Sequence, residues 1–302
     1  MTSIQNFFAP RAGINVLSLF DGISCARVAL QTTGIRVGSY WASEIDANAI
    51  KVSKSNFPQI QHVGSVKDLL VSPGRVDLLI GGSPCQDCSI AKKDRKGLAG
   101  DKSSLFWEYV RIKELTNPKW FLLENVASMS KADHATITKA LGVNPVMFNA
   151  SLVSAQSRKR LFWTNIPFSL PKDAGISLNS ILQPQILPSL AVEGNLTACG
   201  SKTKTDNLIQ IGFLGKNSQG YRVYDPAGKS TNLTATSGGL GGKTGLYRIG
   251  GVIRKLSPVE CERLQGVPDE YTRVVADTNR YKALGNAFNA NVVAHILRGI
   301  AA

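Results

Sequence analysis

The chain has 302 residues, and 43% of them are hydrophobic, which is enough to bury a substantial core and to form two domains. Its formal charge of +14 and isoelectric point near 9.7 predict a polyanionic partner, either nucleic acid or an anionic membrane. No apolar run approaches the roughly 20 residues that a membrane span needs, so no membrane partner is expected. No basic-then-apolar signal opens the chain, and five scattered cysteines fit a reducing cytoplasm.

The first expected unit is a strand, a turn of small residues and a helix. Residues 14–20 read as the strand, residues 21–26 as the turn, and a helical pattern follows through residues 28–30. Small residues let backbone amides approach a ligand at a helix N-terminus, as in dinucleotide-binding folds. The turn has one glycine where the stricter fingerprint has three, so a plain tight turn explains this stretch equally well.

A second strand is expected near residues 37–42, and Glu44 follows it. An acidic residue at this place can accept hydrogen bonds from ribose hydroxyls. The alternative for Glu44 is a favourable charge at the N-terminus of the next helix, through residues 50–57. A short third strand is expected near residues 62–63.

A fourth strand, residues 76–80, leads to Cys85. The carboxyl edge of an open α/β sheet is where ligands bind, and a thiol there can act as a nucleophile. Two alternatives stay open from this stretch alone: a small core residue, or a redox pair with Cys88. The basic segment 86–103 is interpreted as a lid that closes on DNA, and a helix is expected to open at residues 104–108.

The fifth strand, residues 120–123, delivers Glu124. A carboxylate at the end of an apolar strand is partly desolvated, which suits it to hold or donate a proton. Residues 146–153 and 161–166 are expected to form a hairpin that completes the sheet. Between them, Arg158 and Arg160 alternate and are expected to face the same sheet edge, unless this is only a solvated basic turn.

Composition changes near Pro167, and residues 169–253 are rich in Gly, Ser, Thr and Asn with short β-like runs. We expect a second, smaller domain there. Residues 195–198 recur as residues 232–235, which predicts two similar strand–loop–strand units whose polar loops, 199–207 and 236–245, meet DNA phosphates. A short helix is expected over residues 259–264, and a last helix through residues 292–297.

Taken in order, these stretches resemble the cytosine-5 DNA methyltransferases over nearly the whole length. The exact residues within the motifs resemble those of compact bacterial or phage-encoded members. The motifs that carry the resemblance are Phe20-Asp21-Gly22, Gly82-Ser83-Pro84-Cys85-Gln86, Glu124-Asn125-Val126, Gln156-x-Arg158-x-Arg160, Arg254-Lys255-Leu256-Ser257-Pro258 with Arg263-Leu264-Gln265-Gly266, and Gly285-Asn286-Ala287. Two positions depart from it: Ser24 stands where many members have glycine, and Ser65 where many have aspartate.

The resemblance implies an α/β fold, a Rossmann-like sheet that binds S-adenosyl-L-methionine, with a smaller, mostly β target-recognition domain. The catalytic domain would span residues 12–168, completed by residues 280–302, and the recognition domain residues 169–279. The implied reaction transfers a methyl group to carbon 5 of a flipped-out cytosine in duplex DNA through a covalent bond to Cys85. No metal is implied.

The implied site residues fall into three groups. The catalytic ones are Cys85, Glu124, Arg158 and Arg160. The cofactor-binding ones are Phe20, Asp21, Gly22, Ile23, Ser24, Glu44, Ile45, Ser65, Val66, Pro84, Leu105, Asn286 and Ala287. The DNA-binding ones are Gln86, Ser89, Lys92, Lys93, Arg95, Lys96, Lys202, Lys204, Lys243 and Arg254.

Three alternatives to this interpretation explain the sequence less well. A branch with the same motifs modifies transfer RNA, although the Gly/Thr-rich recognition region favours duplex DNA. An inactive DNA-binding homologue need not retain Cys85, Glu124, Arg158 and Arg160 together. An oxidoreductase explains Cys85 and Cys88 but not the charge. We expect a monomer in the cytoplasm of a bacterial or phage-infected cell, with a restriction endonuclease that shares its target site.

Overall fold

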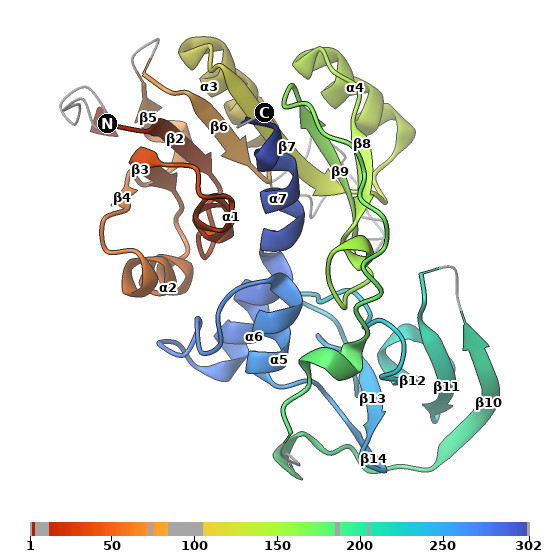
Figure 1. The fold of residues 1–302 in the computed structure, drawn as a ribbon. Coiled ribbons are helices and arrows are strands. Elements are labelled where there is room, and N and C mark those ends of the chain that lie inside the picture. The colour runs from red at the N-terminus through yellow and green to blue at the C-terminus, as the bar shows by residue number, and fades with distance from the viewer. Residues whose placement is uncertain are drawn as a thin grey trace. The chain divides into compact units, whose positions relative to one another are not determined.

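The computed structural model describes residues 2–3, 12–71, 75–83, 105–184, 188–203 and 206–300. The chain forms two compact units (Figure 1). Unit 1 comprises Met1–Phe148, Lys159–Ser169 and Val293–Ala302, and unit 2 comprises Asn149–Arg158 and Leu170–Val292. No helix among the described residues is long and apolar enough to cross a lipid bilayer.

Unit 1 is built on a seven-stranded sheet in the order β4-β3-β2-β6-β7-β9-β8. Neighbours from β4 to β7 pair in parallel, and β9 pairs antiparallel with β7. The strands are β2 (Ile14–Leu19), β3 (Val37–Ser43), β4 (Gln61–His62), β6 (Leu78–Gly81), β7 (Trp120–Val126), β8 (Val146–Asn149) and β9 (Lys159–Thr164). A separate short pair joins β1 (Thr2–Ser3) to β5 (Leu69–Leu70).

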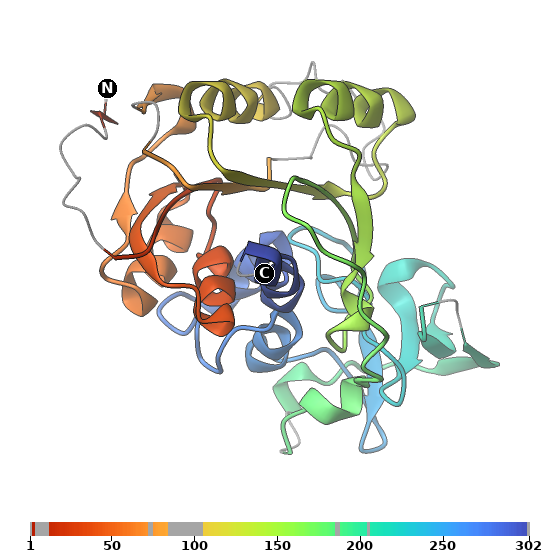
Figure 2. The ribbon, with the colours of Figure 1, turned by 45° about the horizontal axis from the view of Figure 1, so that its top comes forward.

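Helices cover both faces of this sheet (Figure 2). Helices α3 (Leu105–Thr116) and α4 (Lys131–Leu141) lie on one face, and α1 (Cys25–Thr33) and α2 (Ala47–Asn56) lie on the other. Because both faces are covered, the parallel strands are nearly continuous apolar runs, with Leu17, Leu79 and Leu123 fully buried. Helix ends follow local chemistry: Asp46 and Ser130 cap N-termini, and Gly34 and Gly142 end helices in left-handed conformations.

The predicted α/β sheet of unit 1 is confirmed, and its strands lie within a few residues of their expected positions. Strand β7 is longer than predicted, so Glu124 lies within it rather than beyond its end. The expected hairpin is present as β8 and β9. Helix α4 was not predicted, because it is mostly polar and buries only Ile137 and Leu141.

Unit 2 contains a five-stranded sheet in the order β10-β11-β12-β13-β14, whose pairs are antiparallel except β12 with β13. The strands are β10 (Leu196–Thr203), β11 (Ile209–Leu214), β12 (Arg222–Asp225), β13 (Leu246–Ile249) and β14 (Val252–Arg254). Leu214, Val223 and Leu246 form its small apolar core. The helices α5 (Pro258–Gln265) and α6 (Asp277–Asn286) belong to this unit, and α7 (Ala290–Leu297) crosses into unit 1.

The predicted pair of similar strand–loop–strand units is wrong. Residues 196–198 lie in β10, but the second copy of the repeat, residues 232–235, belongs to no strand. That copy is instead held by side chains: Asn232 and Leu233 accept hydrogen bonds from the Arg158 guanidinium. Residues 199–203, expected in a loop, continue β10.

The compact units also differ from the expected domain limits at two segments. Residues 149–158 and 280–292, expected in the catalytic domain, pack within unit 2. Hydrogen bonds explain the grouping, since Ser157 donates its amide to Ser230 and Asn289 donates its side chain to the Leu264 carbonyl. Which segment serves catalysis and which serves recognition stays a prediction.

Candidate active site

The turn between β2 and α1 keeps its backbone in the left-handed region at three positions. Phe20, Gly22 and Ser24 have φ angles of 56°, 58° and 62°. For a residue with a side chain this conformation costs about 1–2 kcal/mol, and such strain persists only where surrounding contacts hold it. A Cβ built on Gly22 meets no atom of the described residues within 4 Å, so this part of the turn borders open space.

Glu44 joins this turn to the end of β3. Its Oε2 accepts a hydrogen bond from the Gly22 amide at 2.8 Å, and its Oε1 accepts from the amides of Ile45 and Asp46 at 2.7 and 2.8 Å. A carboxylate offers about four acceptor sites, so Glu44 retains capacity for a further donor. The next side chain, Ile45, is 75% exposed, which is unusual for an aliphatic residue beside a buried strand.

Asp21 belongs to this turn, and its side chain is buried. Its carboxylate accepts hydrogen bonds from the Ser24 hydroxyl at 2.5 Å and from the Tyr40 hydroxyl at 2.6 Å. Burial raises the pKa of Asp21 from 3.8 to about 6; the nearby Glu44 charge adds to the rise, while the hydroxyl donors oppose it. Asp21 therefore acts within the protein and is not exposed toward the open space above Gly22.

The remaining predicted cofactor residues of unit 1 have mixed surroundings. Ile23 is 1% exposed and belongs to the core, so its side chain does not reach a ligand. Ser65 caps a short 3-10 turn by accepting from the Lys67 amide, and Val66 is buried while its carbonyl accepts from Arg111. Phe20 and Leu105 are partly buried against the main core.

Glu124 and Arg160 form an ion pair across two adjacent strands. Arg160 Nε lies 2.8 Å from Glu124 Oε1, and their side chains are 14% and 13% exposed. Strand register explains the contact: Glu124 lies opposite Phe162 and Val126 opposite Arg160, so the two side chains lie diagonally on the same face of the sheet. The structure therefore brings together two of the predicted catalytic residues.

The segment that leads to the predicted nucleophile is anchored to the residue that follows Glu124 in β7. Ser83 follows β6, is 5% exposed, and accepts a hydrogen bond from the Asn125 amide group at 3.3 Å. Asn125 is the neighbour of Glu124 in β7. Cys85 and Pro84 themselves lie outside the described residues. The sequence assigns Asn125 no role, because nothing local indicates a partner 42 residues away.

Arg158 and Arg160 have separate sets of partners, and that they share one face stays a prediction. Arg158 is 3% exposed and belongs to unit 2, where its guanidinium donates to Asn232 Oδ1, Leu233 O, Gly285 O and Ala287 O at 2.7, 3.0, 3.2 and 2.9 Å. These acceptors account for its burial. Arg158 thus ties residues 232–233 to residues 285–287, the segment that contains the predicted cofactor residues Asn286 and Ala287.

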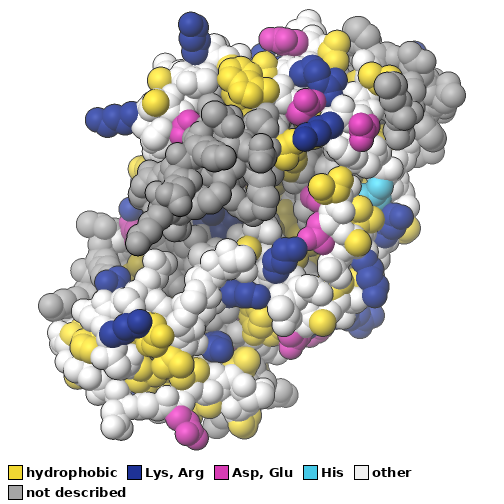
Figure 3. All heavy atoms as spheres, turned by 180° about the vertical axis from the view of Figure 1, so that it is seen from behind, with side chains coloured by type: hydrophobic (Ala, Val, Ile, Leu, Met, Phe, Trp, Pro, Cys, Tyr) yellow, Lys and Arg dark blue, Asp and Glu magenta, His cyan; other side chains and the backbone are white. Residues whose placement is uncertain are grey.

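The predicted DNA-binding residues are only partly described. Gln86, Ser89, Lys92, Lys93, Arg95, Lys96 and Lys204 lie outside the described residues, and for Lys202 only the place in β10 is known. Lys243 is half-buried and donates to the Thr278 carbonyl at 3.3 Å. Lys and Arg side chains recur on the surface seen in Figure 3, in keeping with the charge of +14.

The prediction that Arg254 contacts DNA is wrong. Arg254 is 2% exposed and pairs through two hydrogen bonds with Glu260, at 2.7 and 2.8 Å. Glu260 in turn belongs to the capping box of α5 with Ser257. A guanidinium satisfied in this way is not available to a phosphate group.

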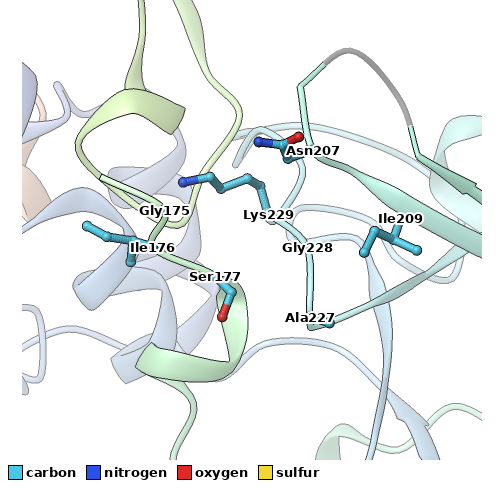
Figure 4. A pocket seen from close by; sticks show the side chains of 8 residues that line it. All are labelled: Gly175, Ile176, Ser177, Asn207, Ile209, Ala227, Gly228 and Lys229. Carbon is cyan, nitrogen blue, oxygen red and sulfur yellow. The ribbon is translucent and has the colours of Figure 1, made fainter. Parts of the chain in front are cut away.

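Unit 2 contains a pocket of about 250 Å³ (Figure 4). Its described lining residues are Gly175, Ile176, Ser177, Asn207, Ile209, Ala227, Gly228 and Lys229. The cation among these described lining residues is already satisfied: Lys229 Nζ donates to the carbonyls of Ser151 and Ser154 and to Asp173 at 2.7, 3.2 and 3.2 Å. These contacts indicate a structural role for Lys229.

Comparison with known proteins identifies the family. The model of the C-5 cytosine-specific DNA methylases matches residues 14–188 and 201–302. Type II methyltransferase M.HhaI of Haemophilus parahaemolyticus is 29% identical over 315 residues, which cover 95% of this chain and 94% of that protein. Type II methyltransferase M1.ScrFI of Lactococcus lactis subsp. cremoris is 29% identical over 301 residues, or 91% of this chain and 75% of that protein.

Among solved structures, the Entamoeba histolytica methyltransferase EhMeth has the same fold, with a TM-score of 0.73 at 16% identity over 96% of this chain and 98% of that one. The family match spans both units and includes every described motif of the site. The chain therefore belongs to the C-5 cytosine-specific DNA methylase family and is a DNA (cytosine-5-)-methyltransferase.

Proposed function

We propose that this enzyme transfers a methyl group from S-adenosylmethionine to carbon 5 of a flipped-out cytosine within a specific duplex sequence, through a transient covalent bond to Cys85. The observation that carries the proposal is the Glu124–Arg160 ion pair at 2.8 Å, together with the hydrogen bond that joins Ser83, two residues before Cys85, to Asn125 of the same strand as Glu124. These contacts support an acid and a cation that act beside the segment leading to Cys85, at the carboxyl edge of one sheet.

The turn at Gly22 fits an adenosine-containing cofactor. The open space above Gly22 leaves room for a ligand, Glu44 retains acceptor capacity for a ribose hydroxyl, and the exposed Ile45 offers an apolar surface for a purine ring. When bound, S-adenosylmethionine supplies an electrophilic methyl group. Phe20 and Leu105 lie at the edge of the same core and would limit access of water.

The chain's own residues would activate the cytosine ring. The Cys85 thiolate bonds to carbon 6, and the electron pair of the ring double bond moves toward nitrogen 3. Glu124 holds a proton at nitrogen 3 while Arg160 donates to the carbonyl oxygen, so the developing charge is stabilised. Carbon 5 would gain the methyl group as the bond between that methyl and the donor sulfur breaks, which leaves neutral S-adenosylhomocysteine. A base then removes the proton of carbon 5, the electron pair of that C–H bond re-forms the double bond to carbon 6 and expels the Cys85 thiolate, and nitrogen 3 returns its proton to Glu124.

Carbon 6 is inaccessible within a stacked duplex, so the base must leave the helix at a cost of a few kcal/mol. The basic segment 92–96 follows Cys85 in the sequence, and its contacts with the strand backbone would offset this cost. Arg158 supports the reaction indirectly, because it organises residues 285–287 rather than touching the base.

One assay tests the proposal and its rivals together. Mixed-sequence duplex DNA and unmodified transfer RNA are incubated at equal concentrations with the enzyme and S-adenosylmethionine, and both are sequenced after bisulfite conversion. We expect 5-methylcytosine at one recurring DNA sequence. Methylation confined to transfer RNA would contradict the DNA assignment, and methylation of neither by a folded protein would favour an inactive homologue.

A further inference from the structure

A chain of hydrogen bonds runs beneath the left-handed turn from the sheet edge to Asp21. His62 Nε2 lies 3.2 Å from Ser53 Oγ, Ser53 Oγ lies 2.6 Å from Ser24 Oγ, and Ser24 donates to Asp21 Oδ2 at 2.5 Å. Ser24 and Ser53 are both fully buried. The chain thus connects β4 and α2 to the turn between β2 and α1, all within unit 1.

The Asp21 carboxylate at the end of this series fixes which group donates in each hydrogen bond. An ionised Asp21 only accepts, so Ser24 uses its single hydrogen on Asp21 and must accept from Ser53. Ser53 has then used its hydrogen and must accept from His62, which requires a hydrogen on His62 Nε2. Burial and the nearby Lys54 lower the pKa of His62, which agrees with a neutral ring.

The hydrogen-bonded side chains stabilise a backbone conformation at Ser24 that is unfavourable by itself. Ser24 has a φ of 62°, a conformation that favours glycine, and it is held there by two hydroxyl contacts. The same turn presents the Gly22 amide to Glu44, while the Asp21 amide donates to Ser43 at the end of β3. A displacement at Ser24 would therefore move both Gly22 and Glu44.

We propose that Ser24, Ser53 and His62 are positioning residues that hold the Gly22–Glu44 contact in the geometry that binds S-adenosylmethionine. The inference rests on the proposed function, because it assigns the cofactor to this turn. None of the three side chains needs to touch the cofactor. The groups that face the chain are Tyr40 and Glu44 near Asp21, and Lys54 and Glu44 near His62.

His62 gives the sharpest test, because it is only half-buried and its variants should fold. His62→Gln keeps an N–H donor for Ser53, whereas His62→Leu removes it at similar volume. Binding of S-adenosylmethionine is measured by calorimetry without DNA. We expect about tenfold weaker binding for His62→Leu and Ser53→Ala, the effect of about one buried hydrogen bond, and less than about twofold for His62→Gln. Thr32→Ala is the control, since its hydroxyl bonds only within α1, to Val28.

Two further readouts separate positioning from a loss of stability. In steady-state assays, the KM for S-adenosylmethionine should rise in His62→Leu and Ser53→Ala, while kcat at saturating cofactor and the KM for DNA stay unchanged. In Ser24→Ala, the loss of a donor should raise the pKa of Asp21, seen as an upward shift of its carboxyl NMR titration. Ser24→Ala combined with Ser53→Ala should bind no more weakly than Ser24→Ala alone.

The outcomes distinguish the two proposals. If the wild-type protein does not bind S-adenosylmethionine, the cofactor assignment is wrong and the inference falls with it. If the wild type binds, but His62→Leu and Ser53→Ala bind as tightly as His62→Gln and Thr32→Ala, the inference alone is overturned. If Ser53→Ala or Ser24→Ala does not fold, the S-adenosylmethionine affinities of His62→Leu and His62→Gln still test the inference, and equal affinities would overturn it.

Discussion

Arg160 Nε lies 2.8 Å from Glu124 Oε1, and both side chains are largely buried on one face of the unit 1 sheet. The ion pair holds the carboxylate beside the guanidinium before any substrate is present. Because strand register sets the contact, the geometry is preorganised, which is the condition under which electrostatic stabilisation contributes most to catalysis.

We predict that Arg160→Ala lowers kcat by about 10²–10³, because it removes a donor to the developing charge and leaves Glu124 without its partner. Glu124→Gln should cause a loss of similar size. In a double-mutant cycle the two losses should not add, since each variant disables the same pair. Fully additive losses in kcat would show that the two residues act separately.

We predict that Arg158→Ala destabilises the protein by about 3 kcal/mol or more, because four buried oxygen atoms lose their donor. Lys159→Ala is the matched control, since its side chain is exposed in the next position. Urea unfolding measures both. Equal unfolding free energies for the two variants would contradict the role of Arg158 in holding residues 232–233 and 285–287.

The raised pKa of Asp21 predicts that the unfolding free energy depends on pH. Its pKa rises from 3.8 to about 6 on folding, so between these values the folded state binds more protons than the unfolded state. Stability from this group is present below pH 4 and is lost as pH rises through 6, by about 3 kcal/mol at 1.36 kcal/mol per unit. Asp21→Asn lacks this loss, so its unfolding free energy relative to wild type should rise by that amount from pH 4 to 7. A constant difference over this range would refute the shift.

We predict that Arg254→Ala costs about 3–5 kcal/mol of stability, because it leaves the fully buried Glu260 carboxylate unpaired. Its DNA affinity, measured at a temperature where the variant is folded, should equal that of wild type. Arg248→Ala, which alters an exposed arginine on the neighbouring strand, should leave stability unchanged. A large loss of DNA affinity by folded Arg254→Ala would restore the phosphate contact that burial argues against.

The sheet of unit 1 is predictable from the sequence because strands buried on both faces are continuous apolar runs with turn residues at their ends. The same reasoning locates Glu44 and Glu124, since each directly follows or ends such a run. Basic residues were harder to interpret: Arg158 and Arg254 read as solvated or DNA-facing, yet both are buried by partners brought together only by the fold.

No local feature of the sequence indicates the roles of Ser53 and His62. Ser53 and His62 lie 29 and 38 residues after Ser24, and only the packing of α2 and β4 beside the turn places them in one hydrogen-bonded chain. The repeated Asn-Leu-Thr-Ala segment misled in the opposite way, because identical residues form a strand in one copy and a buried anchor for Arg158 in the other.

The central claim is a covalent bond between Cys85 and carbon 6 of the target cytosine, and trapping it is the most direct measurement. DNA that carries 5-fluorocytosine at the target position cannot lose a proton from carbon 5 after methylation, so the adduct persists. We expect wild-type enzyme with S-adenosylmethionine to give a protein–DNA band that survives a denaturing gel, and Cys85→Ala to give none. An enzyme that methylates ordinary DNA but forms no such band, or a Cys85→Ala variant that still turns over, would contradict the mechanism.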